Sequence, residues 1–307
     1  MKTIMKTKKD YKVSIVIPTY KRPDKLDRAV DSVLNQTYSN IEVIVVDDNS
    51  PGTEGRKRTE SIMERYSSES RVIYVKHEFN KNGSAARNTG AKMSTGDFIG
   101  FLDDDDQFLP KKIESQINKL LSLSDDWGMC YNHYYTQKEN ESLIPVKEHR
   151  EGDLFLPALK QMLNINAGSN LLIRRKAFES IGGFDESFKR NQDHEFLVRL
   201  LHKYKLAFVA EPGLIYSIGT TNVKINYEET IRHYIETFKP YIDELNSKDK
   251  KEFYDRINKL RLLNFIHPNC DLKNAFKLFL NGEVGLLSGS SFILIETVKY
   301  IIRRIKR

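Results

Sequence analysis

The sequence predicts an α/β fold: a doubly wound, mostly parallel open sheet with a small C-terminal helical extension. Three observations support this fold class. The first 125 residues alternate short β-branched or apolar runs with segments of helical periodicity. Residues 13–46 form a strand–helix–strand unit, whose strands are parallel when the crossover is right-handed. Three predicted strands end in charged and polar clusters, and such strand ends are where open α/β sheets bind ligands.

The individual elements follow from local patterns. Residues 13–17 are a β-branched run closed by Pro18, which predicts a strand. Apolar residues from 26 to 34 recur at i, i+3, i+4, i+7 and i+8, which predicts an amphipathic helix over 24–36 with Asp24 as its N-cap. Further strands are expected at 41–46, 71–75, 98–102, 129–135 and 170–174, further helices at 54–66, 83–94, 111–123 and 192–204, and mostly helical structure over 227–282.

Composition limits the class of protein. The chain has 307 residues, 39% hydrophobic and 30% charged, as in soluble globular proteins. Its two cysteines, Cys130 and Cys270, are far apart, which excludes a disulfide framework or cysteine zinc site and fits a reducing compartment. Of the net charge of +7, the first twelve residues contribute +4 and the last nine +5, which leaves −2 for the body between them. Nucleic acid is therefore not an expected partner.

The two ends of the chain define the expected domain organisation. Residues 1–12 are a basic tail without the apolar region of a secretory signal. Residues 13–222 are the expected catalytic domain, and residues 223–307 are an expected helical region. Residues 284–302 contain Glu296 and Lys299 and do not predict a membrane span. Residues 291–307 have one apolar and one cationic side, which favours contact with an anionic membrane; a helix that packs on the domain is the alternative.

The polar strand ends predict the chemistry of the site. They are residues 18–22, residues 47–50, and the four consecutive aspartates 103–106. If the strands are parallel, all three lie at one edge of the sheet. Adjacent carboxylates need a cation or abundant water, and oxygen ligands favour Mg²⁺ or Mn²⁺. A phosphate-bearing ligand with a divalent cation would satisfy the arrangement, and Arg22 and Arg87 would meet the remaining phosphate charge; a solvated acidic turn is the alternative.

Other site types fit poorly. An EF-hand placed at Asp103 has Phe108 where a glycine is required. The sequence contains no G-x-x-x-x-G-K-[ST] phosphate loop, no G-x-G-x-x-G after the first strand, no H-E-x-x-H and no G-x-S-x-G.

Several motifs occur together in order and spacing over residues 13–219, and with them the chain resembles the family 2 glycosyltransferases, which have a GT-A fold. No single motif is specific, but the ordered set is. The motifs are V-S-I-V-I-P-T-Y-x-R at 13–22, S-V-L-N-Q-T at 32–37, I-V-V-D-D-N-S at 44–50, G-x-x-x-R-N-x-G at 83–90, F-L-D-D-D-D at 101–106, G-G-F-D at 182–185 and Q-D-H-E at 192–195.

The resemblance implies an inverting transferase that uses a nucleotide-diphosphate sugar, often UDP-linked. It implies that Pro18, Thr19, Tyr20 and Asp48 hold base and ribose, and that Arg22, Arg87 and Asn88 belong to the donor site. It also implies that Asp104 faces ribose or diphosphate, that Asp105 binds Mn²⁺ or Mg²⁺, and that Asp103 shares this metal.

The base required for inversion is assigned by motif to Asp193, since one carboxylate opposite the leaving group suffices. The alternative for Asp193 is an ordinary helix N-cap. Two departures from the family are Gln192, where relatives often have glutamate, and Tyr216-Ser217-Ile218, where many relatives have a metal-binding histidine.

The resemblance further implies a glycan or lipid-linked acceptor in surface polysaccharide biosynthesis, at the cytoplasmic face of the membrane. Rival functions are a sugar nucleotidyltransferase, which should have a glycine-rich basic loop after the first strand, a glycoside hydrolase, and a non-catalytic nucleotide-sugar-binding module of the same fold.

Overall fold

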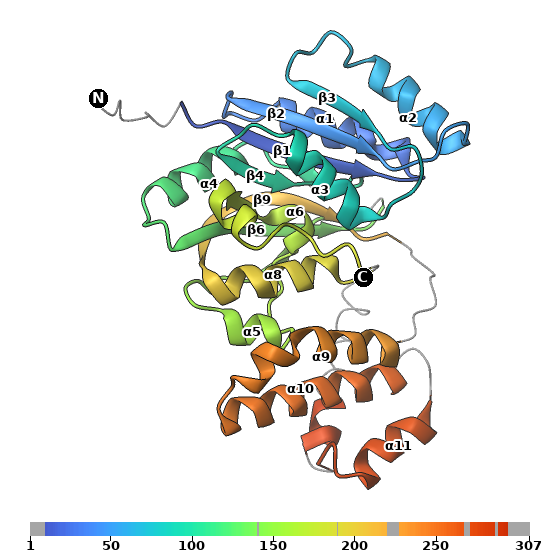
Figure 1. The fold of residues 1–307 in the computed structure, drawn as a ribbon, viewed down its shortest axis with the longest axis vertical. Coiled ribbons are helices and arrows are strands. Elements are labelled where there is room, and N and C mark those ends of the chain that lie inside the picture. The colour runs from blue at the N-terminus through green and yellow to red at the C-terminus, as the bar shows by residue number, and fades with distance from the viewer. Residues whose placement is uncertain are drawn as a thin grey trace. The chain divides into compact units, whose positions relative to one another are not determined.

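A nine-stranded mixed sheet organises the first of two units into which the chain divides, residues 1–221 and 222–307 (Figure 1). The computed structural model describes residues 10–139, 141–188, 190–219, 227–266, 271–285 and 288–293. The strands are β1 (Val13–Thr19), β2 (Ile41–Asp47), β3 (Val72–Lys76), β4 (Phe98–Phe101), β5 (Gln107–Phe108), β6 (Trp127–Gln137), β7 (Ile144–Val146), β8 (Leu172–Arg174) and β9 (Lys205–Ser217).

The strand order confirms the predicted fold class. Eight strands run β3-β2-β1-β4-β8-β6-β9-β5, and β7 pairs with β6. The pairs β1–β2, β1–β4 and β2–β3 are parallel, so the carboxyl ends of β1, β2 and β4 lie at the same edge of the sheet. β8 is antiparallel to both β4 and β6. The three polar clusters predicted to share an edge therefore do so.

Helices cover both faces of the parallel part of the sheet. Side chains alternate along β1, so Ile15 and Ile17 pack in one cluster with Leu26 and Val30 of α1 (Leu26–Leu34). Val16 points to the other face, against α3 (Gly83–Met93). A Cβ at Gly90 of α3 would lie 2.3 Å from Val16 Cγ1, so only glycine allows this close approach of helix and strand.

The predicted N-cap of α1, Asp24, is wrong. The chain enters α1 through a 3₁₀ turn, η2 (Pro23–Lys25), and Asp24 lies inside this turn, where it pairs with Arg58 instead of capping the helix. The other helices are α2 (Glu54–Glu64), α4 (Lys112–Leu121), α5 (Phe155–Leu159), α6 (Ala167–Asn170), α7 (Arg175–Ser180) and α8 (Gln192–Lys203).

Two elements that the sequence pattern did not predict shape the site. β9 pairs in parallel with β6 and antiparallel with β5, although Pro212 and Gly213 interrupt its β-strand pattern. The four-residue helix α6 is held by the buried side chain of Lys112. The Lys112 Nζ donates to the Asn170 carbonyl at 2.8 Å and to Asn170 Oδ1 at 3.0 Å. Burial lowers the pKa of Lys112 to about 7.

The second unit is helical where the structure describes it. It contains α9 (Tyr227–Asp243), α10 (Ser247–Ile266) and α11 (Leu272–Leu280). Arg261 of α10 pairs with Glu228 of α9 and with Glu283 after α11. The predicted amphipathic tail at 291–307 lies outside the described residues from 294 onward. Among the described helices, none has the length and apolar character needed to cross a bilayer.

Candidate active site

The four aspartates form a tight turn at the end of β4. The Asp106 N–H donates to the Asp103 carbonyl at 3.0 Å, which places Asp104 and Asp105 at the tip. β4 leads into the turn from the buried part of the sheet, and β5 leads out of it. The turn therefore presents its carboxylates at the carboxyl edge of the sheet.

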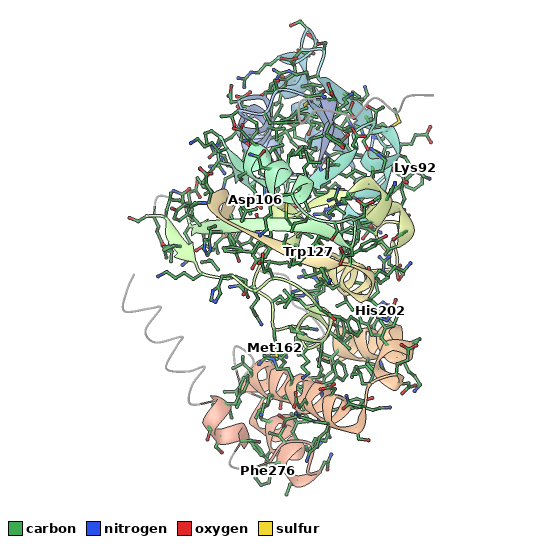
Figure 2. The ribbon with its side chains drawn as sticks, turned by 90° about the vertical axis from the view of Figure 1, so that its left-hand side faces the viewer. Lys92, Asp106, Trp127, Met162, His202 and Phe276 are labelled. Atoms are coloured by element: carbon green, nitrogen blue, oxygen red, sulfur yellow. The ribbon has the colours of Figure 1, made fainter. Side chains whose placement is uncertain are left out.

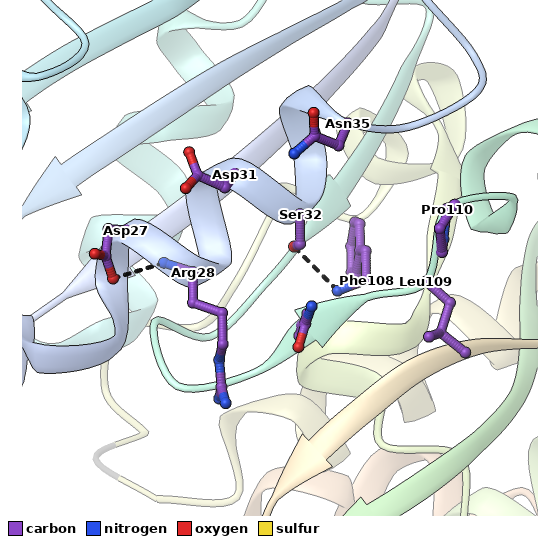
Figure 3. Close-up of a pocket in the computed structure, with 9 residues that line it drawn as sticks. Asp27, Arg28, Asp31, Ser32, Asn35, Phe108, Leu109 and Pro110 are labelled. Carbon is purple, nitrogen blue, oxygen red and sulfur yellow. Dashed lines mark hydrogen bonds between the residues drawn. The ribbon is translucent and has the colours of Figure 1, made fainter.

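Two elements distant in sequence fix the backbone of this turn. Arg28 of α1 donates to the Asp105 carbonyl at 2.7 Å, and the Ser217 hydroxyl of β9 donates to the same carbonyl at 2.5 Å. The Ser217 N–H donates to Asp106 Oδ1 at 2.8 Å. Figure 3 shows β5 beside α1, where the Phe108 N–H donates to Ser32 Oγ at 3.1 Å. The position of the turn is thus set by α1 and β9 together.

The side chain of Asp104 joins the turn to the polar end of β1. Thr19 Oγ1 donates to Asp104 Oδ2 at 2.8 Å, and Arg22 Nη2 donates to Asp104 Oδ1 at 3.0 Å. Arg22 Nη1 also donates to Asp105 Oδ2 at 2.7 Å. The structure therefore brings the predicted residues Thr19, Arg22, Asp104 and Asp105 into direct contact.

The carboxylates of the turn carry more negative charge than their surroundings offset. Burial raises the pKa of Asp104 to about 7, although Arg22 and the Thr19 hydroxyl act in the opposite direction. Burial also raises the pKa of Asp105, and the charge of Arg22 opposes this rise. Burial and the charge of Asp103 together raise the pKa of Asp106. Asp106, labelled in Figure 2, is fully buried, and its Oδ2 has no hydrogen-bond partner among the residues that the structure describes. Such a cluster takes up protons or a cation.

The donor set fits a hard divalent cation. Among the described residues, no three Asp, Glu, His or Cys side chains converge as a ready-made metal site. Mg²⁺ and Mn²⁺ are, however, commonly held by one or two carboxylates together with phosphate oxygens of a substrate. The oxygen-only chemistry, the raised pKa values and the unpaired Asp106 Oδ2 all fit that mode of binding.

Arg87 of α3 connects the turn to α8. Its Nη2 donates to Asp103 Oδ1 at 2.5 Å, and its Nη1 donates to Gln192 Oε1 at 3.1 Å. Gln192 is the first residue of α8 and Asp193 the second, because Asn191 is the N-cap. The alternative role of Asp193 as a helix cap is therefore wrong.

Asp103 and Asp193 border the same small space. A Cβ built on Gly168 of α6 would lie 3.5 Å from Asp103 Oδ2 and 4.0 Å from the Cβ of Asp193. Burial, followed by the charges of Asp106, Asp103, Asp105 and Asp193, raises the pKa of Tyr216 on β9. Asp103, one of the two predicted metal-binding aspartates, and the predicted base Asp193 are thus neighbours across a glycine.

Two predicted donor-site residues organise loops of the protein itself. Asp48 is buried, and its carboxylate contacts the backbone N–H groups of Lys81 and Asn82 at 2.8 and 3.0 Å, together with the His77 ring at 2.8 Å. It therefore shapes the loop that leads into α3. Asn88 exchanges hydrogen bonds of 2.9 Å with both backbone groups of Phe184.

The corner that Asn88 holds, residues 182–186, lies before α8. Gly182 and Gly183 have φ values of +75° and +79°, and a Cβ at Gly183 would come within 2.6 Å of Asn88 Oδ1. Arg199 of α8 donates to the carbonyls of Ile181 and Gly183 at 2.6 and 2.8 Å. Its partner Glu195 is buried, so this ion pair locks the corner onto the helix that carries Asp193.

The end of β1 borders a cavity. Pro18 is the penultimate residue of β1, half-buried and paired with Val46, and Tyr20 is 39% exposed. Tyr20, Lys21, Asn49 and Ser50 line a cavity of about 340 Å³ together with residues of α2. Lys21 has a φ of +59°, and its N–H donates to Asn49 Oδ1 at 3.0 Å.

Sequence reasoning missed Arg28, Gly168 and Ser169. It assigned no role to Tyr216 and Ser217, which it noted only because many relatives have a histidine in that region. Ser169 Oγ accepts from the Asp103 N–H at 3.1 Å and so belongs to the support of the turn. Arg28 had no distinguishing signal, because a charged residue on the polar side of an amphipathic helix is ordinary. The others lie on α6 and β9, the two elements whose patterns were too short or too interrupted to predict.

Comparison with known proteins agrees with this geometry. Residues 14–182, more than half of the chain, match the family model described as glycosyl transferase family 2. The chain is 34% identical over 228 residues to an uncharacterized glycosyltransferase of Rickettsia typhi, covering 71% of this chain and 68% of that relative. It is 28% identical over 244 residues to the amylovoran biosynthesis glycosyltransferase AmsB of Erwinia amylovora, covering 76% of this chain and 80% of AmsB.

Solved structures show the same fold. The crystal structure of S. aureus TarS residues 1–349 in complex with UDP-GlcNAc matches with a TM-score of 0.62 at 17% sequence identity. The match covers 80% of this chain and 72% of that chain.

The raised pKa of Asp104 gives a testable pH dependence. Its folded-state pKa of about 7 lies above that of the unfolded chain, so ionisation costs stability as the pH rises above about 4, and the full cost is reached above about 7. Asp104→Asn, which mimics the protonated acid, should therefore raise the free energy of unfolding by about 2–4 kcal/mol near pH 8. The gain should disappear near pH 4 in urea unfolding curves.

The control is Asp125→Asn, since the Asp125 side chain is 84% exposed. A loss of stability in Asp104→Asn near pH 8 would contradict the prediction.

Proposed function

The chain belongs to glycosyl transferase family 2, and on that basis we propose an inverting, metal-dependent enzyme that transfers a sugar from a nucleotide-diphosphate sugar to an acceptor hydroxyl. The observation that carries this proposal is the placement of Asp193 beside the aspartate turn, with only the Gly168 position between them. A leaving-group site and a base on opposite sides of one sugar ring are what inversion requires.

We assign the nucleotide to the carboxyl ends of β1 and β2. Tyr20 and the cavity beside it provide an aromatic wall for the base, with Pro18, Thr19 and Asp48 shaping the surrounding loops. Asp104 faces ribose or diphosphate. The donor is proposed to be UDP-linked because the TarS neighbour was crystallised with UDP-GlcNAc and with UDP.

Asp105 and Asp103 are the proposed ligands of Mn²⁺ or Mg²⁺. When bound, the ion supplies positive charge to the diphosphate as it departs. Arg87 contributes a fixed positive charge at the same place, because its side chain is only 11% exposed and already contacts Asp103. Asn88 acts indirectly, through the corner that precedes α8.

Asp193 is the proposed base. It takes the proton from the acceptor hydroxyl, whose oxygen attacks the anomeric carbon while the bond to the diphosphate oxygen breaks on the opposite face. Arg199 and Glu195 hold the helix that carries Asp193, and Arg87 fixes the neighbouring Gln192. The acceptor is proposed to be a glycan or lipid-linked glycan of a surface polysaccharide, since the relative AmsB is an amylovoran biosynthesis enzyme.

Loss of the base should separate catalysis from binding. With Mn²⁺, UDP-sugars and acceptor, the wild-type protein should release UDP, whereas Asp193→Asn should reduce kcat by about 10²–10⁴-fold. Its Kd for UDP in the presence of Mn²⁺ should stay within about threefold of wild type. A UDP-release assay and calorimetry measure the two quantities. Asp185→Asn in the nearby corner is the control, and retained turnover in Asp193→Asn would refute the assignment of the base.

A second variant tests the space between Asp103 and Asp193. A methyl group at Gly168 would make only ordinary van der Waals contacts in the free protein, so Gly168→Ala should fold with an unchanged melting temperature. It would nevertheless fill the position where the sugar is proposed to lie, and kcat/KM should fall at least about 100-fold, since a small misplacement of reacting groups is costly.

Gly219→Ala, where no atom of the described residues lies within 4 Å of the added Cβ, is the matched control. Full activity of Gly168→Ala would place the sugar elsewhere.

Peripheral contact with an anionic membrane at the cytoplasmic face is a further part of the proposal. It is supported by the basic, amphipathic sequence at 291–307 and by two exposed apolar side chains on α11, Phe276 (59%) and Leu280 (70%), one turn apart. In vesicle flotation, the protein should bind phosphatidylglycerol-containing vesicles, and truncation after Ile293 should reduce binding at least about tenfold. Equal binding to uncharged phosphatidylcholine vesicles would contradict this proposal.

A further inference from the structure

Arg22 contacts both carboxylates at the tip of the aspartate turn through one guanidinium, and no other side chain in the described part of the chain does so. Its Nη2 lies 3.0 Å from Asp104 Oδ1 and its Nη1 lies 2.7 Å from Asp105 Oδ2. The two aspartate side chains are 1% and 16% exposed, whereas that of Arg22 is 56% exposed. The carboxylates are therefore fixed in the protein, while the arginine reaches them from the solvent side.

This arrangement places the Arg22 charge where the turn needs a cation. For both Asp104 and Asp105, the charge of Arg22 is the largest influence that opposes the effect of burial on the pKa. Arg87, which pairs with a third carboxylate of the turn, is 11% exposed and is held by Gln192 as well as by Asp103. Of these two arginines, only Arg22 is free to leave without disturbing packed elements.

A divalent ion that binds Asp105 must approach a carboxylate whose Oδ2 already accepts from Arg22 at 2.7 Å. Repulsion between the ion and the guanidinium then opposes binding, since both are positive and within a few ångströms. A diphosphate removes this obstacle, because guanidinium groups bind phosphate oxygens in a bidentate manner and Arg22 needs only to rotate outward. Metal and nucleotide would therefore favour each other's binding through one side chain.

We propose that Arg22 is a positioning residue that occupies Asp105, a proposed metal ligand, together with Asp104 in the free protein and moves to the diphosphate when the nucleotide binds, so that the ion binds together with the nucleotide and only weakly before it. The inference rests on the proposed function and adds an order of binding to it. It requires that Arg22 lower the affinity for the metal alone and raise the affinity for the nucleotide with its metal.

The test is Mn²⁺ binding to the full chain, measured from the free Mn²⁺ signal by electron paramagnetic resonance, without and with UDP. In wild type, UDP should raise Mn²⁺ affinity at least about tenfold. Arg22→Ala should bind Mn²⁺ alone about 5–10-fold more tightly than wild type and lose most of the enhancement by UDP. Work at about pH 8 keeps protons from replacing the missing arginine.

Arg22→Gln, which keeps the length and polarity of the side chain without its charge, should change both affinities in the same direction as Arg22→Ala. The matched control is Arg65→Ala, because Arg65 is 57% exposed and pairs with Asp27 at 2.9 Å away from the turn. Its Mn²⁺ binding should equal that of wild type.

The outcomes separate the two proposals. If wild type binds Mn²⁺ with UDP, but both Arg22 variants bind Mn²⁺ alone no better than wild type, the exchange of Arg22 is refuted and the proposed function stands. If wild type binds Mn²⁺ neither alone nor with UDP, the metal-dependent function fails, and the role of Arg22 fails with it.

Discussion

The negative charge buried at the end of β4 is the constraint on which the rest of the site depends. Asp104 and Asp106 are almost entirely removed from water, and an isolated ionised carboxylate in that environment is costly. Three arginines from different elements offset the charge: Arg22 from the end of β1, Arg28 from α1 and Arg87 from α3. Even so, the pKa of Asp104 stays near 7. The turn therefore holds acidic groups whose charge is only partly compensated until a ligand arrives.

The mixed half of the sheet, where parallel and antiparallel pairs meet, supports the same turn. β9 ends at Ser217, whose hydroxyl and N–H both bond to the aspartate turn. Helix α6 supplies Ser169, which accepts from the Asp103 N–H, and Gly168, which lies next to the Asp103 side chain. The buried Lys112 holds α6 in this position. A lysine with so low a pKa is an expensive support. Its two hydrogen bonds to Asn170 fix the position of α6. A helix of only four residues is not stable through its own hydrogen bonds alone.

The parallel half of the sheet and the aspartate turn could be predicted from the sequence because their signals are local. β1, β2 and β4 are continuous apolar runs, and α1 has a clear 3.6-residue period. β9 could not be predicted in the same way, since Pro212 and Gly213 break its pattern and its pairing with β6 depends on contacts some 80 residues apart. Gly168 had no signal, because its importance lies in what the missing Cβ leaves open. Motif matching gave Asn88 a donor contact, whereas its hydrogen bonds are made to the corner before α8.

The contacts of Arg87 give a physical explanation for Gln192, which stands at a position where the family resemblance leads us to expect glutamate. One guanidinium serves Asp103 through Nη2 and Gln192 through Nη1. A glutamate at 192, as relatives often have, would be a second carboxylate on the same arginine and would add negative charge next to Asp193. Gln192 keeps the hydrogen bond that aligns the start of α8 but leaves the charge of Arg87 to Asp103. Because the buried turn is already short of positive charge, a neutral residue at this position leaves the charge of Arg87 available to the turn.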